Sequence, residues 1–304
     1  MKSMFQFILL AILLLACTEA EHLESGKVEI VTTTTIVADI VQNIGGDKVS
    51  VSGLMGPGID PHVYKASEGD VAKLANAEVI IYSGLHLEGK LTDVFSNFEK
   101  LGKYPVNLGE TLNSNRLIQS QSFGGNYDPH VWFDIDLFME QAKEVAHVLQ
   151  MHAPEHKEYF QNNLNSYLEQ LQALKAELDG LLSEIPKEKR KLVTAHDAFG
   201  YFGRFFDFEV IGLQGLSTTA EAGVQDVQRV SDYIVKHKIK SIFVESSVPR
   251  RTIEALQQAV FAKGHQVEIG DVLYSDALGT KGTEEETYIG MFRYNVKSIV
   301  KGLK

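Results

Sequence analysis

The sequence predicts an α/β protein with two β/α lobes, each built on a mainly parallel sheet, that are joined by one long helix. Short apolar strand patterns alternate with amphipathic helix patterns in both halves of the chain, as in parallel β/α folds. Between the halves, residues 155–185 lack a strand pattern and carry leucines at spacings of three and four. We therefore expect an N-terminal lobe at residues 27–154, a linking helix at 155–185 and a C-terminal lobe at 186–304.

In the first half, helix ends are marked by local signals. A threonine supplies the N-cap of the first helix, apolar residues follow at helical spacing, and Gly45-Gly46 ends it. Strands are expected at 27–33, 49–54, 79–82 and 106–108. Helices are expected at 34–44, 67–77, 91–100 and 134–150.

The second half repeats the alternation of strands and helices. Strands are expected at 191–195, 209–213, 241–245 and 266–269. Helices are expected after Tyr201 and at 224–237, 249–263 and 285–300.

The N-terminus has the pattern of an export signal. Residues 1–16 carry one charge, Lys2, before an apolar run that is shorter than the roughly 20 residues of a membrane span. The run ends in Leu-Leu-Ala-Cys, which resembles a bacterial lipobox and makes Cys17 the expected lipidation site. A plain signal peptide with an incidental cysteine is the alternative. Cys17 is the only cysteine, so no internal disulfide can form, and residues 17–26 read as a polar tether.

The net charge of the chain indicates which classes of partner it can bind. The chain has 29 basic and 40 acidic residues, a formal net charge of −11. Such a chain lacks the basic footprint that nucleic-acid binding requires. Acidity can concentrate cations near a surface, and it also keeps proteins soluble.

The motif Asp-Pro-His-Val-aromatic occurs twice, at residues 60–64 and 128–132. Proline holds the preceding residue in extended geometry, so each motif indicates a stiff loop that presents one imidazole, His62 or His130. A single histidine is more often packed or solvated than a ligand. The repetition favours two ligand arms, although two short coincidences would give the same pattern.

Two further residues complete a candidate site. His196 follows the first strand of the second half, and Asp276 lies just beyond the last strand. Ligands of α/β proteins bind outside the carboxyl ends of strands, so two residues from each lobe would hold a small ligand in the cleft between them. Three imidazoles and a carboxylate suit a divalent transition metal, zinc by default, and not calcium or magnesium.

The remaining polar candidates are ambiguous. Asp128, Asp197 and Glu245 could orient the imidazoles, or cap helices and pair locally. The other histidines are expected on the surface or in supporting roles: His22, His86, His147, His152, His156, His237 and His265.

With these motifs the chain resembles the metal-binding lipoproteins of zinc and manganese ABC importers, the TroA/PsaA-like solute-binding proteins. The resemblance rests on residues 58–64, 127–132 and 195–201 and on Asp276. It implies two lobes with a metal buried between them. The ligands that it implies are His62, His130, His196 and Asp276. It also implies a lipid-anchored protein outside the cytoplasm that hands metal to an ABC permease with its ATPase; we expect a monomer and no catalysis.

Two departures from the family bear on the metal. Manganese-dedicated members carry a carboxylate where His196 stands, and zinc scavengers often carry a His-rich acidic loop that residues 113–127 lack. Imidazole favours zinc, because manganese lies at the bottom of the divalent affinity series. We expect Zn²⁺ first, with Mn²⁺ or Fe²⁺ as alternatives.

A zinc hydrolase and a surface adhesin are the two alternative functions. A zinc hydrolase keeps an open water position beside three protein ligands, and no HExxH motif is present. A surface adhesin with a structural metal is compatible with lipid anchoring.

Because the connector is one helix, the two lobes should close only slightly on the metal, with loop motion around Asp276. Metal affinity should fall below about pH 6.5, since a ligating imidazole must be neutral.

Overall fold

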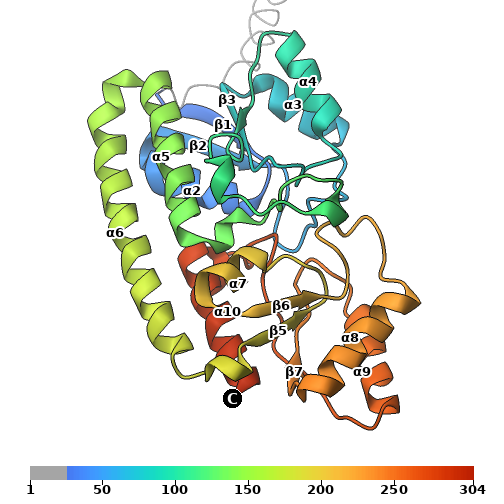
Figure 1. Ribbon diagram of the computed structural model, residues 1–304. Helices are drawn as coiled ribbons and strands as arrows, with labels where there is room; N and C mark the ends of the chain where they lie inside the picture. The colour runs from blue at the N-terminus through green and yellow to red at the C-terminus, as the bar shows by residue number, and fades with distance from the viewer. Residues whose placement is uncertain (1–25) are drawn as a thin grey trace, which may run out of the picture.

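The computed structural model describes residues 26–304 and confirms the two-lobed α/β architecture (Figure 1). The predicted signal peptide, Cys17 and all of the tether except Gly26 lie outside the described residues. The first lobe holds a parallel four-stranded sheet of order β2-β1-β3-β4. Its strands are β1 (Val28–Thr32), β2 (Val49–Gly53), β3 (Val79–Tyr82) and β4 (Val106–Asn107).

Three of the four α-helices of the first lobe start at a side-chain cap. Thr34 Oγ1 accepts a hydrogen bond from the backbone N–H of Val37, and Ser67 with Asp70 forms a capping box. The helices are α2 (Thr35–Gly45), α3 (Glu68–Asn76), α4 (Thr92–Lys100) and α5 (Ile135–His152). Short 3-10 turns occur in this lobe at Gly46–Lys48, Ser114–Arg116, Gln121–Phe123, Val131–Phe133 and Pro154–His156.

A single helix, α6 (Lys157–Leu182), runs along one side of both lobes (Figure 1). At 1.5 Å per residue its 26 residues span about 39 Å. Its buried stripe includes Leu164, Leu171 and Leu178, at the spacing that keeps one helix face against the core. The helix lies inside the predicted 155–185 segment.

The second lobe is built from two short parallel strand pairs joined by a bridge between Thr194 and Phe243. The strands are β5 (Lys191–Thr194), β6 (Glu209–Gly212), β7 (Ser241–Ile242) and β8 (Glu268–Ile269). The helices are α7 (Gly200–Phe206), α8 (Val224–His237), α9 (Arg251–Ala262) and α10 (Tyr288–Leu303). Two 3-10 turns, Lys187–Lys189 and Glu284–Glu286, complete the lobe.

Strand β7 is shorter than the predicted 241–245 because its partner carries an extra residue. From the Ile242–Ile269 pair to the Glu245–Leu273 pair, one chain advances by three residues and the other by four. Such a bulge interrupts the ladder and bends the strand. Gly270 permits the bend, since a Cβ there would lie 2.6 Å from the Phe243 ring.

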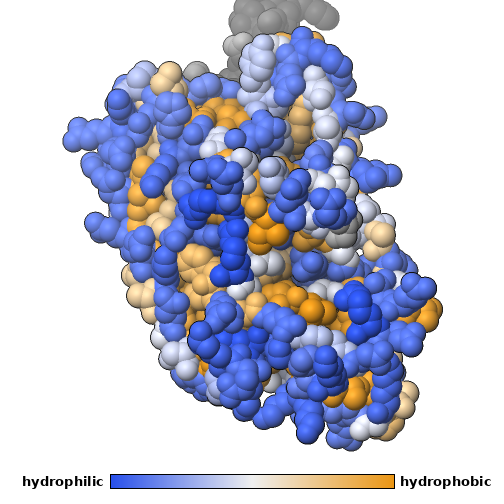
Figure 2. Space-filling model, viewed as in Figure 1, coloured by the Kyte–Doolittle hydropathy of each residue, from blue (hydrophilic) through white to orange (hydrophobic). Residues whose placement is uncertain are grey.

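The largest hydrophobic core runs through both lobes. It includes Ile30 and Val41 of the first lobe, Leu171 of α6, and Phe202 and Phe292 of the second lobe. The lobes are therefore packed together on the side of α6, where α10 lies beside α6 (Figure 1) and also contacts α2. Most of the face in Figure 2 is hydrophilic, with small separate hydrophobic patches. Across residues 26–304, no helix is both long and apolar enough to cross a membrane.

Candidate metal centre

His62 lies on the loop that follows β2, and it is 2% exposed. The preceding aspartate fixes the loop, because Asp60 Oδ1 accepts the backbone N–H of His62 at 2.9 Å. The other oxygen of Asp60 accepts a hydrogen bond from the Thr218 hydroxyl of the second lobe. The first histidine loop is thus held from both lobes.

His130 has the same backbone arrangement and a further contact to its ring. Asp128 Oδ1 accepts the backbone N–H of His130 at 2.9 Å and lies 2.7 Å from His130 Nδ1. Asp128 is itself held, since its N–H donates to Ile118 O and its carbonyl accepts the Tyr201 hydroxyl. With Nδ1 engaged, Nε2 is the ring atom left for a ligand.

His196 is positioned by a buried carboxylate of the next strand. Glu245 Oε2 accepts the N–H of Ala195, and Glu245 Oε1 accepts the N–H of His196, both at 3.0 Å. Glu245 Oε1 also lies 3.2 Å from His196 Nδ1. The His196 carbonyl accepts the Thr194 hydroxyl at 2.8 Å. The imidazole therefore leaves the end of β5 with its Nδ1 side against Glu245.

Asp276 completes the group from the segment beyond the bulge. Its Oδ1 lies 3.3 Å from His130 Nε2, and its Oδ2 lies 3.5 Å from His196 Nε2. The hydroxyls of Ser247 and Ser275 donate to Oδ2 at 2.8 and 3.1 Å. Each carboxylate oxygen thus faces a different imidazole.

The structure brings all four predicted residues to one point. One ligand atom from each of His62, His130, His196 and Asp276 lies within 4.8 Å of the others. The three Nε2 atoms and Asp276 Oδ1 are buried without a hydrogen-bond partner among the described residues. Unpartnered buried polar atoms cost free energy, so four that converge form a pocket suited to a cation with nitrogen and oxygen ligands.

The two motif histidines have opposite electrostatics. Burial, together with the neighbouring imidazoles, lowers the pKa of His62 to about 3, against the opposing effect of Asp276. Burial also lowers the pKa of His130, but Asp128 and Asp276 outweigh it and raise that pKa to about 9. The first imidazole is therefore neutral and the second carries a proton in the metal-free protein at neutral pH.

The two donors of the second lobe stabilise each other's charged forms. Burial opposes the charge on His196, but Asp276 and Glu245 outweigh it and hold the pKa of His196 well above its ordinary value. Burial likewise opposes ionisation of Asp276, and His196 and His130 hold its pKa well below the ordinary value. Without metal, protonated His130 and His196 therefore both face the charged carboxylate of Asp276.

The sequence did not decide which of Asp128, Asp197 and Glu245 orient the imidazoles, and the structure distinguishes among them. Asp128 and Glu245 contact ligand-candidate imidazoles, whereas Asp197 makes no hydrogen bond to any of the three within residues 26–304. Ser247 and Thr218 were missed. Ser247 lies in the turn that follows Glu245, and neither Ser247 nor Thr218 carries a local signal in the sequence.

The other described histidines lie apart from this group. His86, His147 and His152 are exposed, and His156, His237 and His265 are half-buried. His237 packs on Tyr233, and His265 Nε2 lies 2.9 Å from Ile239 O. Their expected surface or supporting roles fit these positions.

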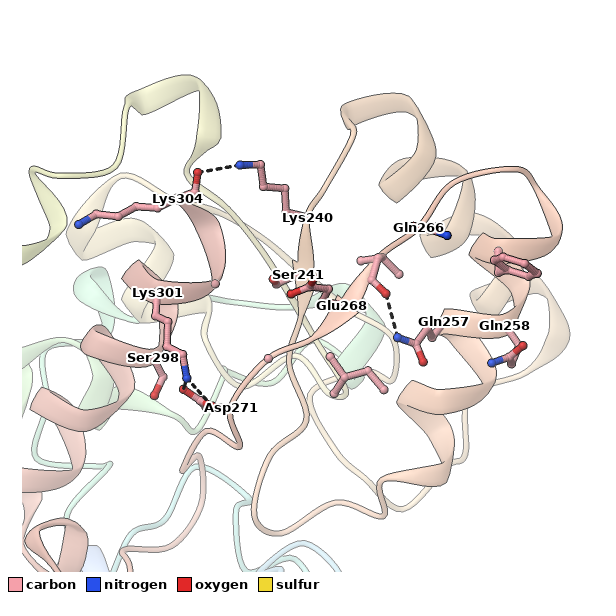
Figure 3. Close-up of a pocket in the computed structure, with 15 residues that line it drawn as sticks. Lys240, Ser241, Gln257, Gln258, Gln266, Glu268, Asp271, Ser298, Lys301 and Lys304 are labelled. Atoms are coloured by element: carbon pink, nitrogen blue, oxygen red, sulfur yellow. Dashed lines mark hydrogen bonds and ion pairs between the residues drawn. The ribbon is translucent and has the colours of Figure 1, made fainter.

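A surface pocket in the second lobe has different chemistry (Figure 3). Lys240 Nζ donates to the Lys304 carbonyl at 2.8 Å, and Lys301 pairs with Asp271 at 2.9 Å. Lys240 and Lys301 thus already have partners within the protein. None of the four converging residues lines this pocket. We assign it no function.

Two parallel α/β lobes, joined by a long helix and holding a buried cluster of ligand atoms between them, define the class of two-lobed solute-binding proteins. The chain belongs to the ZnuA family, described as "Zinc-uptake complex component A periplasmic", whose family model matches residues 30–302.

Individual relatives cover nearly the whole chain. The manganese-binding lipoprotein MntA of Bacillus subtilis is 46% identical over 280 residues, which is 91% of this chain and 90% of MntA. The zinc-binding protein TroA of Treponema pallidum is 44% identical over 278 residues, covering 91% and 89% of the two chains. The solved TroA structure superposes with a TM-score of 0.89 and covers 91% of this chain and 99% of that one.

A third relative names a transporter. The metal ABC transporter substrate-binding lipoprotein ScbA of Streptococcus cristatus is 31% identical over 286 residues, covering 92% of this chain and 90% of ScbA. The family resemblance inferred from the histidine motifs is confirmed by these relatives.

Proposed function

We propose that this protein captures one divalent transition-metal ion outside the cytoplasm and delivers it to an ABC-type permease with its ATPase. The observation that carries the proposal is the convergence of four buried, unpartnered ligand atoms from two lobes. Membership of the ZnuA family and the name of ScbA support the transport role. The metal is the cargo, and no chemical transformation is required of the site.

The proposed ligands are the Nε2 atoms of His62, His130 and His196 and the carboxylate of Asp276. Two come from each proposed lobe, residues 27–154 and 186–304, so a bound ion would tie the lobes together. This set leaves an ion enclosed by protein, which suits storage and handover better than catalysis, where a water position stays open.

The donor set favours zinc among the divalent ions. Three imidazoles and one carboxylate give the N/O environment that zinc accepts readily, while manganese lies at the weak end of the affinity series. The relatives do not indicate which metal is bound, because MntA is named for manganese and TroA for zinc, and the two are nearly equally identical to this chain. We therefore propose Zn²⁺ as the first cargo, with Mn²⁺ or Fe²⁺ as alternatives.

Attachment to the membrane through Cys17 is the proposed means of keeping the protein near its permease. MntA and ScbA are both named lipoproteins. A lipidated cysteine followed by a short tether would leave the two lobes outside the cytoplasm and facing the permease. We propose that the protein works there as a monomer.

The test is metal binding by the purified protein and by matched histidine variants. We expect the wild type to bind one equivalent of zinc in a competition titration, and His62→Ala and His196→Ala to lose most of that affinity. His86→Ala, which removes an exposed histidine outside the cluster, should bind as the wild type does. Zinc binding that survives both of the first two variants would contradict the proposed ligands.

A further inference from the structure

The segment that follows β7 touches both donors of the second lobe. Glu245 forms the last bridge of this segment, and Ser246 and Ser247 lie in the turn that follows, which the Val248 N–H closes by donating to Glu245 O at 3.2 Å. Glu245 holds His196 through the contacts described above, and the Ser247 hydroxyl donates to Asp276 Oδ2 at 2.8 Å. Ser246 lies between them, and its buried hydroxyl has no hydrogen-bond partner among the described residues.

These contacts make the two oxygens of Asp276 inequivalent. Oδ2 accepts hydrogen bonds from Ser247 and Ser275, whereas Oδ1 accepts none within the described part of the chain. Each hydrogen bond draws on a lone pair of Oδ2 and weakens it as a metal donor, so Oδ1 is the stronger donor. The contact from Ser247 is the shorter of the two, and it comes from a different segment than Asp276 itself.

We propose that Ser247 is a specificity-determining residue that makes Asp276 a predominantly one-oxygen donor and thereby favours zinc over manganese. This inference rests on the proposed metal centre. Three imidazoles and one strong oxygen match the low coordination number of zinc. Manganese prefers more oxygen ligands and a larger coordination shell, which a carboxylate free to offer both oxygens would supply better.

The experiment compares zinc and manganese affinities of the purified protein and its Ser247→Ala variant, each measured by competition with a chelator. We expect zinc affinity to fall about tenfold, as is common when a hydrogen bond to a metal ligand is removed. Manganese affinity should fall less or rise, so the ratio of zinc to manganese affinity should drop.

Ser246→Ala is the matched control, because it makes the same change at the adjacent position and removes a hydroxyl without a described partner. The ratio should stay at its wild-type value in this variant. A second pair, Ser247→Thr and Ser247→Val, keeps one shape and differs only in the hydroxyl. Only the valine variant should lower the ratio of zinc to manganese affinity. This pair still tests the inference if the alanine variant folds poorly.

The outcomes separate this inference from the proposed function. If both metals lose affinity by the same factor in Ser247→Ala and in Ser247→Val, or if neither changes, Ser247 does not set the preference and the inference is overturned. A wild-type protein that binds neither metal would instead overturn the proposed function, and the inference with it.

Discussion

Asp60 and Asp128 occupy the same position in the two histidine motifs, but their side chains contact different groups. Each accepts the backbone N–H of its histidine at 2.9 Å. Only Asp128 also lies against its imidazole, while Asp60 turns its second oxygen to Thr218. The repeated motif therefore fixes the backbone in the same way, and the surroundings decide the charge of each ring.

Metal affinity should rise steeply with pH across the neutral range. His130, with a pKa of about 9, and His196 hold protons in the metal-free centre that a metal ion must displace. Both pKa values are raised, and the His130 proton persists below about pH 9, so affinity falls as pH falls; His62 stays neutral throughout. The pH range over which metal affinity changes therefore lies above the value of about 6.5 that an unperturbed imidazole would give.

Chelator-competition titrations of zinc from pH 6 to 9 check this, with proton release measured by calorimetry in buffers of different ionisation enthalpy. Equal affinity at all of these pH values would show that the imidazoles carry no protons before metal binds. Protonation of His130 also contributes stability to the metal-free fold below about pH 6.5, which is lost as pH rises through 9.

Removing the charge of Asp128 should weaken metal binding, because Asp128 fixes the ring that presents His130 Nε2. We expect Asp128→Asn to lose about tenfold to a hundredfold in zinc affinity, measured near pH 9, where proton competition is weakest. Asp197→Asn is the matched control, since Asp197 also lies close in sequence to a proposed ligand but makes no hydrogen bond to the three imidazoles in the described chain. Similar losses in both variants would argue for a general effect of charge.

Trp132 should report metal binding by its fluorescence. Its indole N–H donates to Ser275 O at 2.9 Å, and its ring lies 5.4 Å from the His130 ring. An ion bound by His130 and Asp276 would alter the surroundings of the indole from both sides. Trp132 is the only tryptophan, so any change in emission on adding zinc belongs to it; constant emission at saturating zinc would contradict this placement.

Among the elements, four helices pack together beside the candidate metal centre. The Tyr288 ring of α10 stacks on Phe138 of α5 at 3.7 Å, and its hydroxyl donates to Trp132 O at 2.6 Å. Asp39 of α2 accepts hydrogen bonds from the Tyr288 backbone N–H and from the Tyr167 hydroxyl of α6. Helix α10 thus joins the second lobe to the helices of the first.

Helix α6 should contribute stability without touching the site. Leu171 is fully buried on its inner face, so Leu171→Ala should lower the free energy of unfolding by about 2–5 kcal/mol. Gln170→Ala changes the exposed neighbour and should stay within about 0.5 kcal/mol of the wild type. Urea unfolding of the metal-free proteins gives both values, and comparable values for the two variants would contradict the assigned inner face. Zinc stoichiometry should remain at the wild-type value in each.

For the molecule as a whole, the shared core limits how far the lobes can separate. Phe133 stacks on Phe199 at 4.5 Å and packs edge-on against Phe292 at 5.7 Å, so aromatic rings from both halves interlock. A large rotation of one lobe would have to break this packing, which close-packed interiors resist. Motion on metal release is therefore expected in loops more than in the lobes.

Hydrogen exchange can test this expectation. We expect metal to slow amide exchange mainly in residues 273–279, around Asp276, with little change in α6. In the metal-free protein the Leu278 N–H still has the Thr35 hydroxyl as acceptor at 2.8 Å, so its protection should change less than that of its neighbours. Widespread changes along α6 on metal removal would instead indicate a hinge within the helix.

The alternation of strands and helices, the long connector and the four converging residues could be predicted from the amino-acid sequence. These rest on local physics: periodicity sets which face is buried, prolines stiffen the histidine loops, and the carboxyl ends of parallel strands meet at one edge. The predicted fold class is confirmed, and His62, His130, His196 and Asp276 lie together as expected, although their binding of metal stays a proposal.

The residues that support these four, and the charge that each of the four carries, could be established only from the folded chain. The bulge that shortens β7 depends on a close approach between Gly270 and Phe243, which lie far apart in sequence. Thr218 reaches Asp60 across 158 positions, and Ser247 reaches Asp276 across 29. The opposite pKa shifts of His62 and His130 arise from such neighbours, because burial and the distance between charges are fixed only when distant segments of the chain pack together.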